Sequence, residues 1–171
     1  MVPRRPRSEA DETQAEVAAY VAVGADESVQ RIITAINRLS KRLAQWYDRQ
    51  LADLDVSAGE WTVLQALARE PDGAPLTPSR LAEAAGVAPS SMTHRLDRMV
   101  DRGLVTRDPD PGNRTRVLVR LSEEGRKLFA VAILDSNMVE SDLMASLSDR
   151  QKEQLIGLLD RLIHGLDQAD L

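Results

Sequence analysis

The stretch that decides the fold is Leu76–Gly125, which reads LTPSRLAEAAGVAPSSMTHRLDRMVDRGLVTRDPDPGNRTRVLVRLSEEG. Thr77 and the proline after it are typical of a helix start, and Gly86 is expected to end that short helix. A second helix is expected over Pro89–Arg102, because Gly103 follows it as a stop signal. Two short helices joined by a few residues that include a glycine are the pattern of a helix-turn-helix.

A β-hairpin is expected directly after the two helices. The apolar pattern predicts one strand over Leu104–Arg107 and a second strand over Arg116–Leu121. Between them, residues 108–113 contain two prolines, a glycine and an asparagine, which are turn residues. Strand, turn and strand after a helix-turn-helix form a wing, so this part of the chain predicts a winged helix-turn-helix.

Helices are expected on both sides of the winged helix-turn-helix. A long one over Glu27–Ala52 has apolar residues at helical spacing, and a shorter one is expected over Thr13–Val23. Another is expected over Glu123–Ser146 after the capping residue Ser122, and the last runs from the capping residue Ser148 to about residue 167. Ser57 and Glu60 have the spacing of a capping box, which predicts a helix start ahead of the helix-turn-helix. The final helix has more leucines than one face of an isolated helix needs. We therefore expect the first long helix and the last two helices to form a dimer interface.

The fold class that follows is mainly α with a small β wing, in which dimerisation helices flank a winged helix-turn-helix domain. The expected regions are a disordered basic tail at 1–12, an N-terminal helix and a dimerisation helix at 13–56, the DNA-binding domain at 57–121 and C-terminal dimerisation helices at 122–171.

Composition and charge narrow the class of protein. The 171 residues carry a net charge of −5, yet residues 76–126 hold nine arginines against seven carboxylates. The chain has no cysteine, which excludes disulfides and thiolate metal sites. No run of about 18 apolar residues could span a membrane, and no nucleophile elbow or glycine-rich phosphate loop is present. We expect a cytoplasmic protein that is not an enzyme, with no metal, no cofactor and no membrane association.

The second helix of the helix-turn-helix is expected to have one apolar and one polar face. The polar face carries Ser90, Ser91, His94 and Arg98 near its N-terminal end, the end that a recognition helix places in the major groove. The polar face also carries Asp97 and Asp101, which could orient neighbouring arginines. The alternative interpretation is an ordinary amphipathic surface helix. The full set of expected DNA contacts is Thr77, Ser90, Ser91, His94, Arg98, Arg114 and Arg116.

These motifs resemble the MarR family of winged-helix regulators. The resemblance covers Leu54–Leu128 and includes the pieces LTPSRLA, PSSMTHRLDRM, RGLV, DPD and VLVRLSEEG. It implies a ligand-responsive repressor that binds a palindromic operator in double-stranded DNA as a homodimer. Where the family has Asp-x-Arg before the second wing strand, this chain has Asn113-Arg114-Thr115. Arg114 is the first candidate for the minor groove and Arg116 the second; a solvated turn is the alternative.

The extra N-terminal helix resembles the urate-responsive branch of the family. By that resemblance Trp61, Arg95 and Arg107 match ligand positions, whereas Thr62 stands where an acidic residue is expected and Tyr20 where a tryptophan is expected. The implied partner is a small anionic or aromatic effector. For Trp61 a place in the core is the alternative, and for Arg95 a salt bridge to a carboxylate on a neighbouring helix.

A different class of function also fits part of the sequence. The acidic balance of the chain, together with Asp97 and Asp101, favours a helical protein-interaction module that uses its winged helix without binding DNA. Retention on heparin and a strong salt dependence of duplex affinity would separate the two functions.

The wing assignment predicts the effect of one substitution. Arg114→Ala should weaken operator binding and leave the dimer intact, because only a minor-groove contact is removed. A gel-shift titration measures this effect. An unaltered operator affinity would show that the wing assignment is wrong.

Overall fold

The computed structural model describes residues 8–169, apart from the side chains of Glu9 and Arg114. The chain divides into two compact units, Met1–Gln50 and Leu51–Leu171. The first unit contains α1 (Glu9–Val21) and most of α2 (Glu27–Asp53). It has its own buried residues, Val17 on α1 and Thr34 on α2.

The first helix begins earlier than the sequence pattern indicated. The Ser8 hydroxyl accepts the N–H of Asp11, and the Asp11 carboxylate accepts the Ser8 N–H at 3.1 Å, which forms a capping box. The prediction of a disordered tail is therefore wrong for residues 8–12, because this local cap satisfies the Asp11 N–H in the first turn and the N–H of Ser8 itself. Residues 1–7 of the predicted tail lie outside the described residues.

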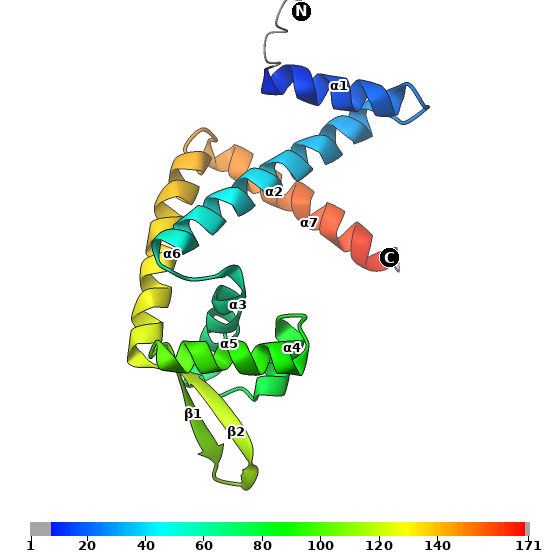
Figure 1. Ribbon diagram of the computed structural model, residues 1–171. Coiled ribbons are helices and arrows are strands. Elements are labelled where there is room, and N and C mark those ends of the chain that lie inside the picture. The colour runs from blue at the N-terminus through cyan, green and yellow to red at the C-terminus, as the bar shows by residue number, and fades with distance from the viewer. Residues whose placement is uncertain (1–7, 170–171) are drawn as a thin grey trace, which may run out of the picture. The chain divides into compact units, whose positions relative to one another are not determined.

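The second unit begins with the winged helix (Figure 1), and its elements follow the predicted order. They are α3 (Ala58–Ala68), the short 3-10 helix η1 (Pro71–Gly73), α4 (Pro78–Ala84), α5 (Pro89–Asp101), β1 (Val105–Asp110) and β2 (Asn113–Leu121). The predicted caps are present, since the Ser57 hydroxyl accepts the Glu60 N–H and the Thr77 hydroxyl accepts the Arg80 N–H. Leu76 forms a single antiparallel bridge to Val119. The predicted fold class, mainly α with a small β wing, is confirmed.

One apolar core holds the winged helix together. Leu64 of α3, Leu81 of α4 and Val119 of β2 are buried together with Met92, Leu96 and Met99 of α5. Each such side chain contributes on the order of 1.5–3 kcal/mol by leaving water. Because the core draws on α3, α4, α5 and β2, it fixes α5 relative to the wing.

The wing strands are longer than predicted. β1 continues through Pro109 to Asp110 and pairs antiparallel with β2, with Val105 opposite Leu121 and Pro109 opposite Val117. The predicted turn over residues 108–113 therefore shortens to residues 111–112. A proline fits in this strand because both strands of a two-stranded sheet are edges, where a missing N–H costs little. The register shifts directly after Pro109, as at a β-bulge.

Two helices complete the second unit, α6 (Glu123–Met144) and α7 (Asp149–Gln168). The Ser122 hydroxyl caps α6 by accepting the Gly125 N–H at 2.9 Å, and Gly125 lies directly against the carbonyl of Leu104. In contrast to the winged helix, α7 has no buried residue along its described length. No helix within residues 8–169 has both the length and the apolar character needed to span a bilayer.

The contact at Gly125 predicts a loss of stability on substitution. A Cβ there would collide with the Leu104 backbone, so Gly125→Ala should lower the free energy of unfolding by about 1–3 kcal/mol. Gly157 on α7 has no atom within 4 Å of an added Cβ, and Gly157→Ala should raise stability by about 0.5–1 kcal/mol. Chemical denaturation of both variants tests this; equal stabilities would contradict it.

Candidate nucleic-acid interface

Helix α5 presents a polar face on the side opposite the core. Met92, Leu96 and Met99 are 0% exposed, and they anchor one side of the helix. The predicted contact residues on the other side, Ser90, Ser91, His94 and Arg98, are all exposed. The structure therefore brings these four side chains together on one accessible face, within about two and a half turns of the helix.

The N-terminal end of α5 is open. Ala88 occupies the capping position, and within residues 8–169 no side chain accepts a hydrogen bond from the first turn. Free N–H groups at a helix start, together with the hydroxyls of Ser90 and Ser91, favour an anion such as a phosphate. Thr77 is half-buried, and its hydroxyl oxygen already caps α4 by accepting the Arg80 N–H at 3.3 Å. Within the described residues the Thr77 hydroxyl donates no hydrogen bond, so its hydrogen can point to a ligand.

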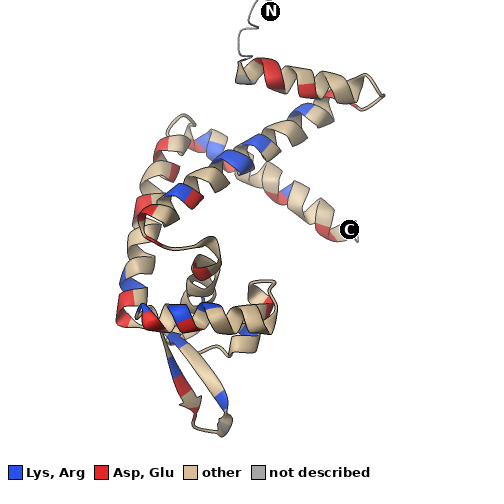
Figure 2. Ribbon diagram, viewed as in Figure 1, with Lys and Arg blue, Asp and Glu red and all other residues tan. Residues whose placement is uncertain are grey.

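The basic side chains around α5 fall into two groups. Figure 2 shows Lys and Arg interspersed with Asp and Glu along α5 and the wing. One group is paired, and its members are Arg80 with Glu83 (3.3 Å), Arg102 with Glu60 (3.1 Å) and Arg107 with Asp97. In the second group, Arg98 and His94 make no ion pair or side-chain hydrogen bond with any part of the described chain. These two side chains can therefore offer all their donors to a nucleic acid.

Asp97 lies on the exposed face of α5, where its charge would repel phosphates. Its carboxylate is paired with the guanidinium of Arg107 from β1, and Arg107 also donates to the carbonyl oxygen of Thr93 at 3.2 Å. Within the described residues, the buried Nε of Arg107 has no hydrogen-bond partner. The pair neutralises Asp97 and joins the foot of the wing to the recognition helix.

The wing positions its arginines on β2. The exposed Arg116 guanidinium lies 3.9 Å from the Asp110 carboxylate across the hairpin. The backbone of Arg114 belongs to the same strand, whereas its side chain lies outside the described residues. Asn113 accepts hydrogen bonds from the Thr115 N–H (3.1 Å) and hydroxyl (2.7 Å), so it holds the start of β2 in place.

The residues that the resemblance assigns to ligand binding make different contacts from one another. Trp61 stacks on Phe129 of α6 with ring centroids 5.1 Å apart, and the Thr62 hydroxyl donates to the Ala58 carbonyl at 3.0 Å. Arg95 lies against Gly59 of α3, where a Cβ would collide with its guanidinium, and it forms no ion pair within residues 8–169. Tyr20 is on α1 in the N-terminal unit and is 48% exposed.

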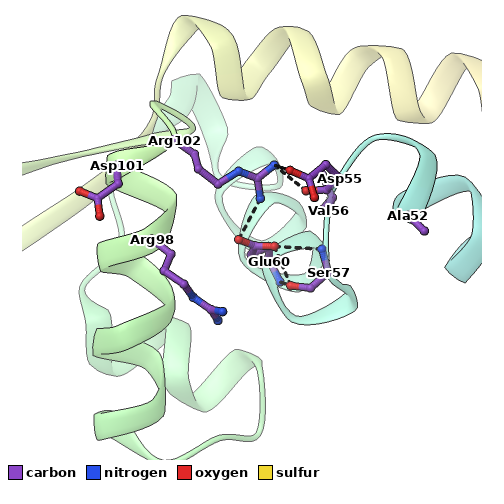
Figure 3. Close-up of a pocket in the computed structure, with 8 residues that line it drawn as sticks. All are labelled: Ala52, Asp55, Val56, Ser57, Glu60, Arg98, Asp101 and Arg102. Carbon is purple, nitrogen blue, oxygen red and sulfur yellow. Dashed lines mark hydrogen bonds and ion pairs between the residues drawn. The ribbon is translucent and has the colours of Figure 1, made fainter.

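Sequence reasoning missed a polar cluster at the C-terminal end of α5. Arg102 of α5 pairs with Glu60 of α3 and with Asp55 in the turn before α3, beside a groove that Arg98 also lines (Figure 3). Glu60 was recognised only as half of a capping box. Its ion pair with Arg102 spans 42 residues and leaves no local sequence signal.

Glu60 is charged despite its burial. Burial raises the pKa of its carboxyl, but the hydrogen bonds from Ser57 and the nearby guanidinium of Arg102 outweigh that effect, so the pKa lies below its ordinary value. The groove is therefore lined by a charged Glu60 carboxylate, and its ion pair with Arg102 joins α3 to the end of α5.

Comparison with known proteins agrees with this arrangement. Residues 53–114 match a model of the MarR family. The HTH-type transcriptional regulator PecS of Dickeya dadantii is 30% identical over 133 residues, which cover 77% of this chain and 79% of PecS.

Solved structures also share the fold. Wild-type MarR from E. coli is 28% identical, has a TM-score of 0.58 and matches over 74% of this chain and 95% of its own. A single-site mutant of S. aureus MepR bound to an oligodeoxyribonucleotide is 24% identical, with a TM-score of 0.61 over 77% of this chain and 95% of its own. From its winged helix-turn-helix and its likeness to PecS, the chain belongs to the MarR family of transcriptional regulators.

Proposed function

We propose that this regulator binds a specific sequence in double-stranded DNA, with α5 in the major groove and the wing beside it. The observation that carries the proposal is the pair of opposite faces on α5. Met92, Leu96 and Met99 anchor it in the core, while His94 and Arg98 stay exposed with no partner in the described chain. Arg and His can read base edges, and serine hydroxyls near the helix start can hold phosphates.

The oligonucleotide-bound MepR structure supports DNA binding as the function, because that protein of the same fold binds an oligodeoxyribonucleotide. PecS is a transcriptional regulator of the helix-turn-helix type, which agrees with this proposal. A net charge of −5 is compatible with DNA binding because Asp97, the acidic side chain in the middle of α5, is neutralised by Arg107.

The protein works as a homodimer in this proposal. Large apolar side chains remain exposed on α2 in the first unit and on α6 and α7 in the second unit, and exposed apolar surface of this extent marks an interaction site. They include Ile32, Ile33, Leu39, Leu134, Met138, Leu143, Leu155, Ile156, Leu158, Leu159, Leu162, Ile163 and Leu166. A second copy of the same chain covers such helices symmetrically, so two recognition helices would read a palindromic operator.

Control by a small effector, and repression as the outcome, complete the proposal. Within residues 8–169, the Arg95 guanidinium beside α3 forms no ion pair and the buried Nε of Arg107 has no acceptor. An anionic or aromatic molecule bound near them would favour a dimer whose recognition helices no longer match the operator, and so would lower its affinity.

Selection of bound sequences from random duplexes tests DNA recognition. We expect a palindrome whose half-sites lie about one helical turn apart, roughly 34 Å. Affinity for that duplex should fall steeply as salt rises, because phosphate contacts release counterions. Failure to enrich any duplex, together with no retention on heparin, would contradict DNA binding and favour the protein-interaction module.

The apolar face of α7 predicts that one added charge separates the dimer. Leu162→Glu should yield monomers and reduce operator affinity at least tenfold, because a buried, unpaired carboxylate is costly and one subunit holds only one half-site. Gln154→Glu adds the same charge on α7 outside the apolar set and should leave the dimer intact. Analytical ultracentrifugation with gel shifts measures both; a dimeric Leu162→Glu protein would place the interface elsewhere.

A further inference from the structure

We propose that Arg102 is a positioning residue, which holds the C-terminal end of the recognition helix against the turn between α2 and α3 and so fixes the pose in which α5 meets DNA. The inference rests on the proposed DNA binding and adds to it a residue that does not touch the nucleic acid. The partners of Arg102 in this role are Glu60 and Asp55.

Arg102 is the C-cap residue of α5, and its guanidinium bridges two segments (Figure 3). One nitrogen, Nη1, lies 3.1 Å from Oε1 of Glu60. The other, Nη2, donates to the backbone carbonyl of Asp55 and lies 3.4 Å from its carboxylate. The planar guanidinium fixes the direction of each contact, which a lysine could not do at both sites.

Both partners of Arg102 are themselves held in place. Glu60 is 5% exposed, and its second carboxylate oxygen accepts the Ser57 N–H at 2.9 Å and the Ser57 hydroxyl at 2.7 Å. Asp55 has a left-handed backbone, with φ at 54°, a conformation that is uncommon outside glycine. Arg102 is therefore anchored to a rigid capping box and to a sharply turned backbone.

This anchor acts on the same side of α5 as Arg98. Arg98 precedes Arg102 by one helical turn, and both side chains line the groove. Met92, Leu96 and Met99 hold α5 by apolar contact, which is non-directional and allows rotation about the helix axis more readily than a hydrogen bond does. The contacts of Arg102 restrict that rotation, and with it the direction in which His94 and Arg98 point.

Two substitutions separate positioning from simple charge. Glu60→Gln keeps an acceptor for Ser57 but removes the negative charge that holds Arg102. If charge alone mattered, losing a carboxylate near DNA would tighten binding; positioning predicts weaker binding instead. Arg102→Gln removes the guanidinium itself, and with it the contacts to both Glu60 and Asp55.

The measurement is the affinity of each variant for the duplex recovered by selection and for a mixed-sequence duplex of equal length. We expect Glu60→Gln to weaken binding to the selected duplex about 3- to 30-fold and to leave the mixed-sequence affinity equal or higher. Arg102→Gln should lower the ratio of the affinity for the selected duplex to the affinity for the mixed-sequence duplex by a similar factor.

Arg126→Gln is the matched control. Arg126 also bridges a backbone carbonyl, that of Leu121 (2.9 Å), and a carboxylate, that of Glu123 (3.3 Å), but it does so on α6. It should leave the ratio of affinities unchanged. An unchanged ratio in Glu60→Gln and Arg102→Gln, with wild type still selecting a duplex, would overturn the positioning role and leave the proposed function standing.

Hydrogen exchange tests the same inference without DNA. Glu60→Gln and Arg102→Gln should each speed amide exchange in two separate peptides, residues 53–58 and 98–104, while exchange in the rest of α3 and in α6 stays as in wild type. A loss of protection throughout the unit, or none in either peptide, would contradict a local anchor. The exchange measurement tests the anchor whether or not the selection yields an operator.

Discussion

The orientation of α5 depends on the burial of Met92, Leu96 and Met99, and the rest of the second unit depends on that orientation. These side chains occupy positions 92, 96 and 99, so they form one stripe along a 13-residue helix. Once the stripe is buried against α3, α4 and β2, geometry forces Ser91, His94 and Arg98 outward. The core therefore decides which side of α5 is polar and exposed, and the ion pairs of α5 limit the rotation that remains.

Ion pairing then decides which side chains on the polar face of α5 are available to bind the phosphates and bases of a nucleic acid. The chain is acidic overall, yet Asp97 is neutralised by Arg107 and Glu60 by Arg102. Each pair also joins α5 to a neighbour, the first to the wing and the second to α3. The same carboxylates that lower the net charge thus order the recognition helix and leave the charge of Arg98 uncompensated.

Most of the fold could be predicted because local residues mark where helices start and end. The caps and the glycines with positive φ did so, namely Ser57, Thr77, Ser122, Ser148, Gly86 and Gly103. Pro109 was assigned to a turn, because its place in a strand depends on the sheet having two strands. At the candidate site, the exposed residues of α5 follow from periodicity. The partners of Arg102 and Arg107 come from segments up to 47 residues away, and no local sequence pattern connects them.

The two anchors of α5 differ in what they allow. The apolar stripe sets which side of the helix faces the core, and in our proposal the polar contacts at Asp97 and Arg102 limit the rotation that remains. Asp55 lies in the turn that leaves α2, and Glu60 lies in the first turn of α3. A displacement that moves both must either carry Arg102 with it or leave the buried Glu60 carboxylate without its cation. The second outcome is costly, since an unpaired charge in a buried site loses both its hydration and its partner. Movement of the turn therefore favours movement of the recognition helix, and the turn follows directly from α2, a helix that carries exposed apolar residues of the proposed dimer interface.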